Sequence, residues 1–301
     1  MRIRIGARGS ALSLAQTGLV ATALGRHAEV EVVPIRTSGD RLSRAEAPMT
    51  GKDLFTREID EALLAGRIDI GVHSLKDLPS VLPDGLVLAA VPPREDPSDV
   101  LISRDSRSLE SLHRGARVGT SSPRRRAQIL TARPDAEVIE SRGNVDTRIR
   151  RLREGRWDAI VLARAGLARL QRLDEITEVL SPSVMLPAIG QGALAIVARR
   201  DDAAVRDLVA RLGDPPSHRA VDAERALLAL LEAGCRAPVA GLARMEGSRL
   251  VLTGAVFAPD GSRTLREESE SAADDPEALG AEVARRLIAR GAAELIVLAR
   301  G

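Results

Sequence analysis

The segment IGVHSLKDLP, residues 70–79, places side chains that can carry charge directly after an apolar run. What reads as a buried strand is followed by His73, Ser74, Lys76 and Asp77. Open α/β sheets bind ligands at the carboxyl ends of their strands. A carboxylate beside an ammonium group could steady a developing cation or move protons. The alternative is a surface helix start whose charges face water, and spacing alone favours that alternative.

Hydroxyl and guanidinium groups also occur where two expected strands run into helices. Arg8 and Ser10 stand at the first junction, and GTSSPRRR, residues 119–126, stands at the second. Backbone N–H groups at a helix N-terminus bind anions, and guanidinium groups bind carboxylates through paired hydrogen bonds. Each arginine alone could be a solvated surface residue, but the combination at equivalent points favours a polyanionic ligand. The second cluster comprises Thr120, Ser121, Ser122, Arg124 and Arg125, and Arg142 and Arg148 extend it around Gly143 and Asn144.

Cys235 is the only cysteine of the chain and lies in EAGCRAPVAG, residues 232–241, between an expected helix and Pro238. A loop setting leaves the thiol accessible, and Arg236 would favour the thiolate, although a lone cysteine is more often an inert apolar residue. One cysteine excludes an intrachain disulfide and fits a reducing compartment, so we expect a cytoplasmic protein. One cysteine and four scattered histidines lack the spacing of metal ligands, and no metal site is expected.

Composition argues against nucleic acid and membrane as partners. The 44 Lys and Arg residues face 42 Asp and Glu residues, and the only aromatic residues are Phe55, Trp157 and Phe257. Phosphate contacts need a basic excess, and single-stranded nucleic acid needs aromatic stacking surfaces. No run of about 18 apolar residues occurs, and the N-terminus lacks the apolar stretch of a secretory signal. We also expect a monomer, because no long apolar stripe remains for a dimer.

Strands alternate with helices twice, which predicts two α/β lobes built around largely parallel sheets with a ligand cleft between them. The alternative is chance similarity of α/β units. Segment 186–200 is expected to return to the first lobe as a strand, and the C-terminal part reads as α+β, with a last helix at 277–290 and a short strand at 294–299. The matching pairs are 2–10 with 115–130, 28–40 with 136–146, 55–66 with 145–155, and 66–72 with 155–161. The expected domains are 1–93 with 190–212, then 94–189, then 213–301.

Taken together, these motifs resemble the porphobilinogen deaminase family nearly end to end and in the family's order. The matching segments are GARGSALSLAQ, TSGD, GKDLFTREI, DIGVHSLKDLP, REDPSDV, GTSSPRRRAQ, RGNVDTRI, LARAGLARL, LPAIGQGALAI and GCRAPVAG. The resemblance implies a transferase that condenses four porphobilinogen molecules with loss of ammonia and releases the linear tetrapyrrole hydroxymethylbilane by hydrolysis. It also implies that the two lobes are similar to periplasmic binding proteins.

The resemblance assigns roles to individual residues. Cys235 would carry a dipyrromethane cofactor through a thioether, and Asp77 would be the catalytic carboxylate that stabilises the cation formed as ammonia leaves. The cofactor-binding residues would be Asp40, Ser74, Lys76, Thr120, Ser122, Arg124, Arg125, Ser141, Arg142 and Gly143. The substrate-binding residues would be Arg8, Ser10, Arg142, Arg148, Arg169, Phe55 and Gln191, with Gln191 at an interdomain hinge.

Some positions depart from the family pattern, and two other classes of protein compete with this interpretation. Pro48 and Asp53 replace a usual basic residue and a usual glycine, which puts the role of the loop before Phe55 in doubt. Pro123 is tolerable in a first helical turn, and Arg236 stands where a polar residue is common. A non-catalytic, two-lobed polyanion-binding protein would explain the arginines but not the cysteine loop. A nucleic-acid-binding module fits the charge balance least.

Overall fold

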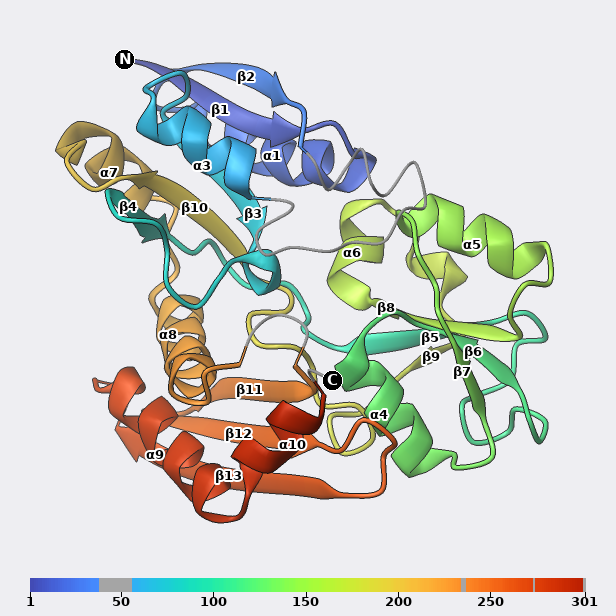
Figure 1. The fold of residues 1–301 in the computed structure, drawn as a ribbon. Coiled ribbons are helices and arrows are strands. Elements are labelled where there is room, and N and C mark those ends of the chain that lie inside the picture. Colours follow the sequence, from blue (N-terminus) through green and yellow to red (C-terminus); the bar gives the residue numbers. More distant parts are fainter. Residues whose placement is uncertain (38–55, 234–236, 273, 300–301) are drawn as a thin grey trace. The chain divides into compact units, whose positions relative to one another are not determined.

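The computed structural model describes residues 1–37, 56–233, 237–272 and 274–299 (Figure 1). Contacts between Cα atoms divide the chain into two compact units. One unit is Met1–Glu95 with Ala193–His218, and the other is Asp96–Gly192 with Arg219–Gly301. This division into two units does not test the three domains expected from the sequence, whose limits remain predictions.

A five-stranded mixed sheet forms the centre of the first unit, in the order β2-β1-β3-β10-β4. β1 runs parallel to β2 and β3, whereas β10 is antiparallel to β3 and β4. Apolar side chains of α1 and α7 pack with those of β1, β3 and β10 in one core cluster. The strands are β1 (Arg2–Arg8), β2 (Glu29–Ile35), β3 (Ile70–Ser74), β4 (Leu86–Ala90) and β10 (Leu194–Arg199), and the helices are α1 (Ala11–Leu24), α3 (Arg57–Leu64) and α7 (Ala203–Ala210).

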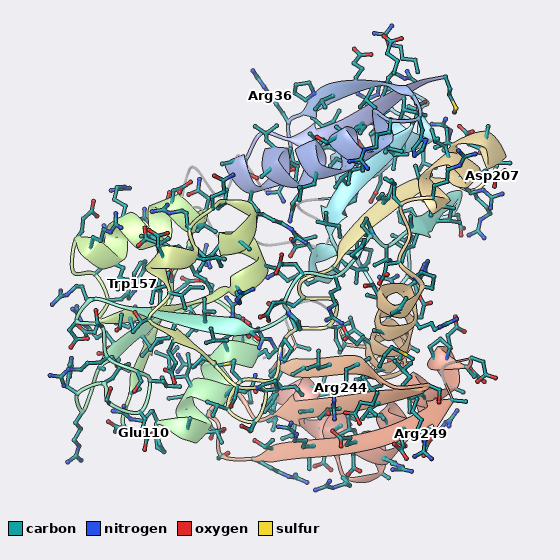
Figure 2. The ribbon with its side chains drawn as sticks, turned by 180° about the vertical axis from the view of Figure 1, so that it is seen from behind. Arg36, Glu110, Trp157, Asp207, Arg244 and Arg249 are labelled. Atoms are coloured by element: carbon teal, nitrogen blue, oxygen red, sulfur yellow. The ribbon has the colours of Figure 1, made fainter. Side chains whose placement is uncertain are left out.

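The second unit contains a sheet of the same design, in the order β7-β6-β8-β5-β9. β6 is parallel to β7 and β8, and β5 is antiparallel to β8 and β9. Trp157, labelled in Figure 2, is buried against Gly119, where a side chain on the glycine would collide with the indole ring. The strands are β5 (Asp99–Ser103), β6 (Arg117–Gly119), β7 (Glu137–Ile139), β8 (Ala159–Ala163) and β9 (Glu178–Val179), and the helices are α4 (Pro123–Ala132), α5 (Val145–Arg153) and α6 (Arg164–Arg169).

Each of the two sheets contains the same pair of hydrogen bonds between an arginine and an aspartate. In the first unit the Arg4 N–H donates to Asp69 Oδ2 at 2.8 Å, and the Asp69 N–H returns to the Arg4 carbonyl at 2.9 Å. In the second unit Arg117 and Asp158 make the same two bonds, at 2.8 and 2.9 Å. The segments that carry these aspartates are the repeated 66–72 and 155–161 of the sequence, so the expectation of two similar α/β lobes is confirmed.

The C-terminal part is an antiparallel sheet, β11-β12-β13, covered by helices (Figure 1). Leu227, Val283 and Leu287 pack with Leu252 in its core. Within the second unit this sheet also meets α4, because Ala127, Leu186 and Phe257 belong to one further cluster. The strands are β11 (Val239–Glu246), β12 (Arg249–Phe257) and β13 (Thr264–Ala272), and the helices are α8 (Pro215–Leu230), α9 (Pro276–Ala289) and α10 (Ala292–Leu298).

The strand expected at 294–299 is wrong, because α10 covers Ala292–Leu298 and Ala299 is its C-cap. Ile296 and Val297 are β-branched, which favours a strand locally. However, Ala292, Leu295 and Ile296 follow helical spacing, and all three are buried in the core between α9 and β12. Tertiary packing therefore overrides local propensity here.

Candidate active site

The β3 strand ends in a short 3-10 helix, Leu75–Asp77, that sorts its side chains by burial. Leu75 and Leu78 are buried, and the Leu75 N–H donates to the Ala193 carbonyl at 3.0 Å. Lys76 is half-buried and Asp77 is exposed. The two leucines therefore fix the turn and leave the Asp77 carboxylate open to a ligand at the carboxyl edge of the sheet.

Arg8 and Ser10 reach the same edge from β1, the parallel neighbour of β3. The Arg8 N–H donates to Ser13 Oγ at 3.1 Å, and Ser10 Oγ caps α1 by accepting from the Ser13 N–H at 3.3 Å. On β3, Ser74 Oγ accepts from Gln16 Nε2 at 2.8 Å. The first unit thus brings together Arg8, Ser10, Ser74, Lys76 and Asp77 at the ends of two adjacent strands.

His73 lies directly before Ser74 and carries no charge near neutral pH. Burial, and then the positive charge of Arg8, lower the pKa of the His73 imidazole to about 4. Its Nε2 atom is buried and has no hydrogen-bond partner among the described residues. The neighbour of Arg8 is therefore neutral, and His73 adds no positive charge to this edge of the sheet.

The β6–α4 turn of the second unit is lined with hydroxyl groups. Thr120 Oγ1 accepts from the Ser122 N–H at 3.2 Å, and Ser122 Oγ caps α4 by accepting from the Arg125 N–H at 3.4 Å. Ser121 Oγ donates to the Ser141 carbonyl at 2.6 Å. Ser141 itself is fully buried, and within the described ranges its Oγ has no partner. A buried hydroxyl without a partner is a donor available to a ligand.

Arg124 and Arg125 are both buried and share one carboxylate, that of Asp99. Arg124 Nη1 lies 2.7 Å from Asp99 Oδ2, and Arg125 Nη2 lies 2.6 Å from Oδ1. Burial alone would raise the pKa of the Asp99 carboxyl, but the two guanidinium groups outweigh it and lower that pKa to about 2. Because one carboxylate faces two arginines, the group keeps a net positive charge.

The segment 186–192 holds this group from the other side. Arg124 Nη1 donates to the Leu186 carbonyl at 2.7 Å, and Gln191 Nε2 donates to Asp99 Oδ1 at 3.0 Å. Arg169 Nη2 donates to the Gly192 carbonyl at 2.6 Å. Asp99 was not predicted from the sequence as a site residue. Its one signal was a charged residue opening the otherwise apolar strand DVLIS, where a buried charge demands a partner.

Arg142 and Arg148 flank the Gly143 loop, which has a φ of 105° and therefore suits glycine. Arg142 pairs with Glu140 at 2.7 Å. Arg148 Nε donates to the Gly143 carbonyl at 2.8 Å, and Arg148 has no carboxylate partner in the part of the chain that the structure describes. Burial, and then Arg125, lower the pKa of the Arg148 guanidinium to about 10. It stays charged at neutral pH and is suited to an incoming carboxylate.

The predicted site residues therefore fall into two groups. The second unit holds Thr120, Ser122, Arg124, Arg125, Ser141, Arg142, Gly143, Arg148, Arg169 and Gln191. The first unit holds Arg8, Ser10, Ser74, Lys76 and Asp77. Asp40, Phe55 and Cys235 lie outside the described residues. The orphaned Ser141 hydroxyl and the Arg148 guanidinium fit a ligand that carries carboxylates, as a dipyrromethane with acetate and propionate side chains does.

The described parts of the chain offer no group of three or more His, Cys, Asp or Glu side chains that could hold a metal ion. In the same residues, no helix combines the length and the apolar character needed to cross a membrane.

Comparison with known proteins gives a match along almost the whole chain. The family model "Porphobilinogen deaminase, dipyromethane cofactor binding domain" matches residues 3–207, and "Porphobilinogen deaminase, C-terminal domain" matches residues 218–289. The porphobilinogen deaminase of Rubrobacter xylanophilus is 48% identical over 304 residues, covering 100% of this chain and 98% of the relative. That of Syntrophobacter fumaroxidans is 45% identical over 300 residues, covering 98% and 96%.

Solved structures give a more distant likeness. The periplasmic VFT2 domain of BvgS from Bordetella pertussis superposes with a TM-score of 0.41 at 15% identity, covering 70% of this chain and 86% of that one. The substrate binding protein of an amino acid ABC transporter gives a TM-score of 0.35 at 17% identity, covering 70% and 91%.

Proposed function

The chain belongs to the porphobilinogen deaminase family, and from that premise we propose that it is a hydroxymethylbilane synthase of tetrapyrrole biosynthesis. The observation that carries the proposal is the match of both family models to consecutive parts of one chain. A non-catalytic polyanion-binding protein is not favoured, because the matched family is enzymatic.

The substrate is porphobilinogen, a pyrrole with an aminomethyl group, an acetate and a propionate. In each condensation the aminomethyl carbon loses ammonia and bonds to the free α-carbon of another pyrrole, which gives up its proton. Four such steps and one hydrolysis yield hydroxymethylbilane and four molecules of ammonia. Cys235 would hold the dipyrromethane, which would supply a tethered pyrrole with a free α-carbon.

Asp77 is the residue to which we assign the chemistry. Positive charge develops on the pyrrole as ammonia departs, and a fixed carboxylate beside that charge lowers the barrier. This assignment is supported by the 3-10 turn, in which buried leucines hold the exposed Asp77 at the edge of the sheet. The same carboxylate can accept the proton that the α-carbon releases. Lys76 and Ser74 would bind the cofactor beside it.

The arginines would bind the acetate and propionate groups. Arg148 has no carboxylate partner among the described residues. Arg124 and Arg125, which share the single carboxylate of Asp99, keep a net positive charge beside Arg148. Arg8, Ser10, Arg142, Arg169, Phe55 and Gln191 would complete the substrate contacts. The cofactor would be held by Asp40, Thr120, Ser122, Arg124, Arg125, Ser141, Arg142 and Gly143, in addition to Ser74 and Lys76.

The test is the intact mass of the purified chain, peptide mapping around Cys235, and an assay with porphobilinogen. We expect an added mass of two linked pyrroles on the Cys235 peptide and formation of hydroxymethylbilane. Cys235→Ser should carry no added mass and form no product. A wild-type chain that stays unmodified and inactive after incubation with porphobilinogen would overturn the proposal.

The monomeric state and the cytoplasmic location stay predictions from the sequence. Sedimentation of the holoenzyme tests the first, and fractionation of the source cells tests the second. DNA should not alter the sedimentation at any salt concentration, since nucleic acid is not an expected partner.

A further inference from the structure

Glu224 is a fully buried acid of α8 to which no role has been assigned so far. Its two carboxylate oxygens accept from two different backbone segments. Oε2 accepts from the Gly190 N–H at 2.6 Å, and Oε1 accepts from the Ala243 N–H at 2.8 Å. Burying a carboxylate is costly without such bonds, so the side chain is tied to both partners.

Gly190 begins a turn, residues 190–192, that is linked to three of the arginines, directly to Arg169 and through Asp99 to Arg124 and Arg125. Gln191 is almost fully buried, and its Nε2 donates to the Pro97 carbonyl at 2.6 Å and to Asp99 Oδ1 at 3.0 Å. Asp99 in turn orients Arg124 and Arg125, and the Gly192 carbonyl accepts from Arg169. Gly190 and Gly192 both have positive φ, 69° and 89°, so the turn depends on a backbone shape that other residues rarely adopt.

We infer that Glu224 is a positioning residue that fixes the 190–192 turn. Through the turn it would fix the orientation of Arg124 and Arg125 toward the carboxylates of the cofactor, and of Arg169 toward those of the substrate. This inference rests on the proposed function. α8 ends at Leu230, shortly before Cys235, so the same helix that leads to the cofactor cysteine also anchors the arginine group. The competing explanation is that Glu224 only stabilises β11 through Ala243.

Three variants and one control separate these explanations in the cofactor-loaded enzyme, whose loading is verified by intact mass. Glu224→Gln keeps one acceptor oxygen, so the Gly190 and Ala243 amides cannot both keep a carboxylate oxygen as partner. Gln191→Leu breaks the next contact in the chain, and the double variant tests whether the two act through one route. Leu227→Ala is the control, because Leu227 is buried in the same helix near Gly241 of β11 and Gly254 of β12, and its apolar side chain makes no hydrogen bond to the turn.

We expect Glu224→Gln and Gln191→Leu each to raise KM for porphobilinogen roughly tenfold with a smaller effect on kcat, because misaligned arginines weaken substrate and transition state alike. The double variant should be no worse than the more severe single variant. Amide exchange of the peptide covering 186–192 should be faster in Glu224→Gln. Leu227→Ala should lower the urea midpoint and leave KM and this exchange unchanged.

The inference is overturned if Glu224→Gln keeps the wild-type KM, if the two single effects add, or if Leu227→Ala raises KM equally. Glu224→Asp, which keeps the charge on a shorter side chain, replaces Glu224→Gln if that variant does not fold, with the same expectations. Failure of the proposed function itself would be seen separately, as a wild-type enzyme that does not turn over porphobilinogen.

Discussion

The two lobes have the same strand order, but the first residue of the antiparallel strand, β10 in one lobe and β5 in the other, differs between them. β10 opens with Leu194, which pairs with Ser74 at the end of β3, and β5 opens with Asp99, which pairs with Ala163 at the end of β8. Both residues are buried. The first lobe therefore has an apolar side chain where the second has a carboxylate between two arginines.

The next turn reverses this pattern. In the first lobe, β3 continues from Ser74 into the exposed Asp77, whereas in the second lobe β8 continues from Ala163 into α6, with Gly166 at the equivalent position. One lobe thus exposes its acid, where it can face a developing cation. The other buries its acid, where it can only orient cations. The same strand order can therefore serve chemistry, when the acid follows the parallel strand, or binding, when the acid begins the antiparallel strand.

The largest effect should follow from removing the exposed acid. Asp77→Asn should lower kcat roughly 10³-fold, because a neutral amide cannot stabilise the cation or take the proton. Thermal unfolding should be unchanged, since the carboxylate is exposed. Asp84→Asn, an exposed acid of the same lobe, is the control and should be fully active. Normal tetrapyrrole formation by Asp77→Asn would contradict the assigned role.

Removing the buried acid should mainly cost stability. Asp99→Leu gives the second lobe the residue of the first and leaves Arg124 and Arg125 buried without a counter-charge, so we expect a loss of about 3–5 kcal/mol in the free energy of unfolding. Urea titration measures it. Glu140→Gln removes the exposed partner of Arg142 and should cost less than about 1 kcal/mol. Equal losses in the two variants would mean that burial does not distinguish the pairs.

Acid should weaken the lobes in different pH ranges. The pKa of His73 is lowered from 6.5 to about 4 in the folded chain, so the unfolded chain binds more protons between these values and stability falls as pH drops through that range. The full loss is about 3 kcal/mol. The pKa of Asp99 is lowered from 3.8 to about 2, so its contribution is lost only below about 3.8.

Unfolding in urea from pH 7 to pH 3 measures these losses. His73→Gln should remove the decline between pH 6.5 and 4 and leave the decline at lower pH. An unchanged pH profile in this variant would show that another group is responsible.

The sequence predicted the parts of this comparison that depend on local pattern. Repeated strand, turn and helix signals identified both lobes, and Ser10 and Ser122 lie at the strand-to-helix junctions where the sequence placed them. The strand expected at 66–72 is shifted, because β3 covers Ile70–Ser74. The roles of Asp99 and Glu224 could not be predicted in this way. Their partners are remote in the chain, Arg125 and Gly190 respectively, and no periodicity relates residues so far apart. The α10 helix was missed for the related reason that its burial is decided by α9 and β12.

The smallest expected effect concerns the unpaired hydroxyl of the second lobe. Ser141→Ala removes a buried polar atom that has no partner among the described residues, so the cofactor-free chain should be as stable as wild type or up to about 1 kcal/mol more stable. We proposed that this hydroxyl binds the carboxylate-bearing cofactor. On that proposal the same change in the loaded enzyme should reduce the stabilisation gained on loading and raise KM about threefold. Thermal unfolding of both forms, with Ser183→Ala as an exposed control, measures the difference. If Ser141→Ala destabilises both forms equally, the hydroxyl serves the fold rather than the ligand.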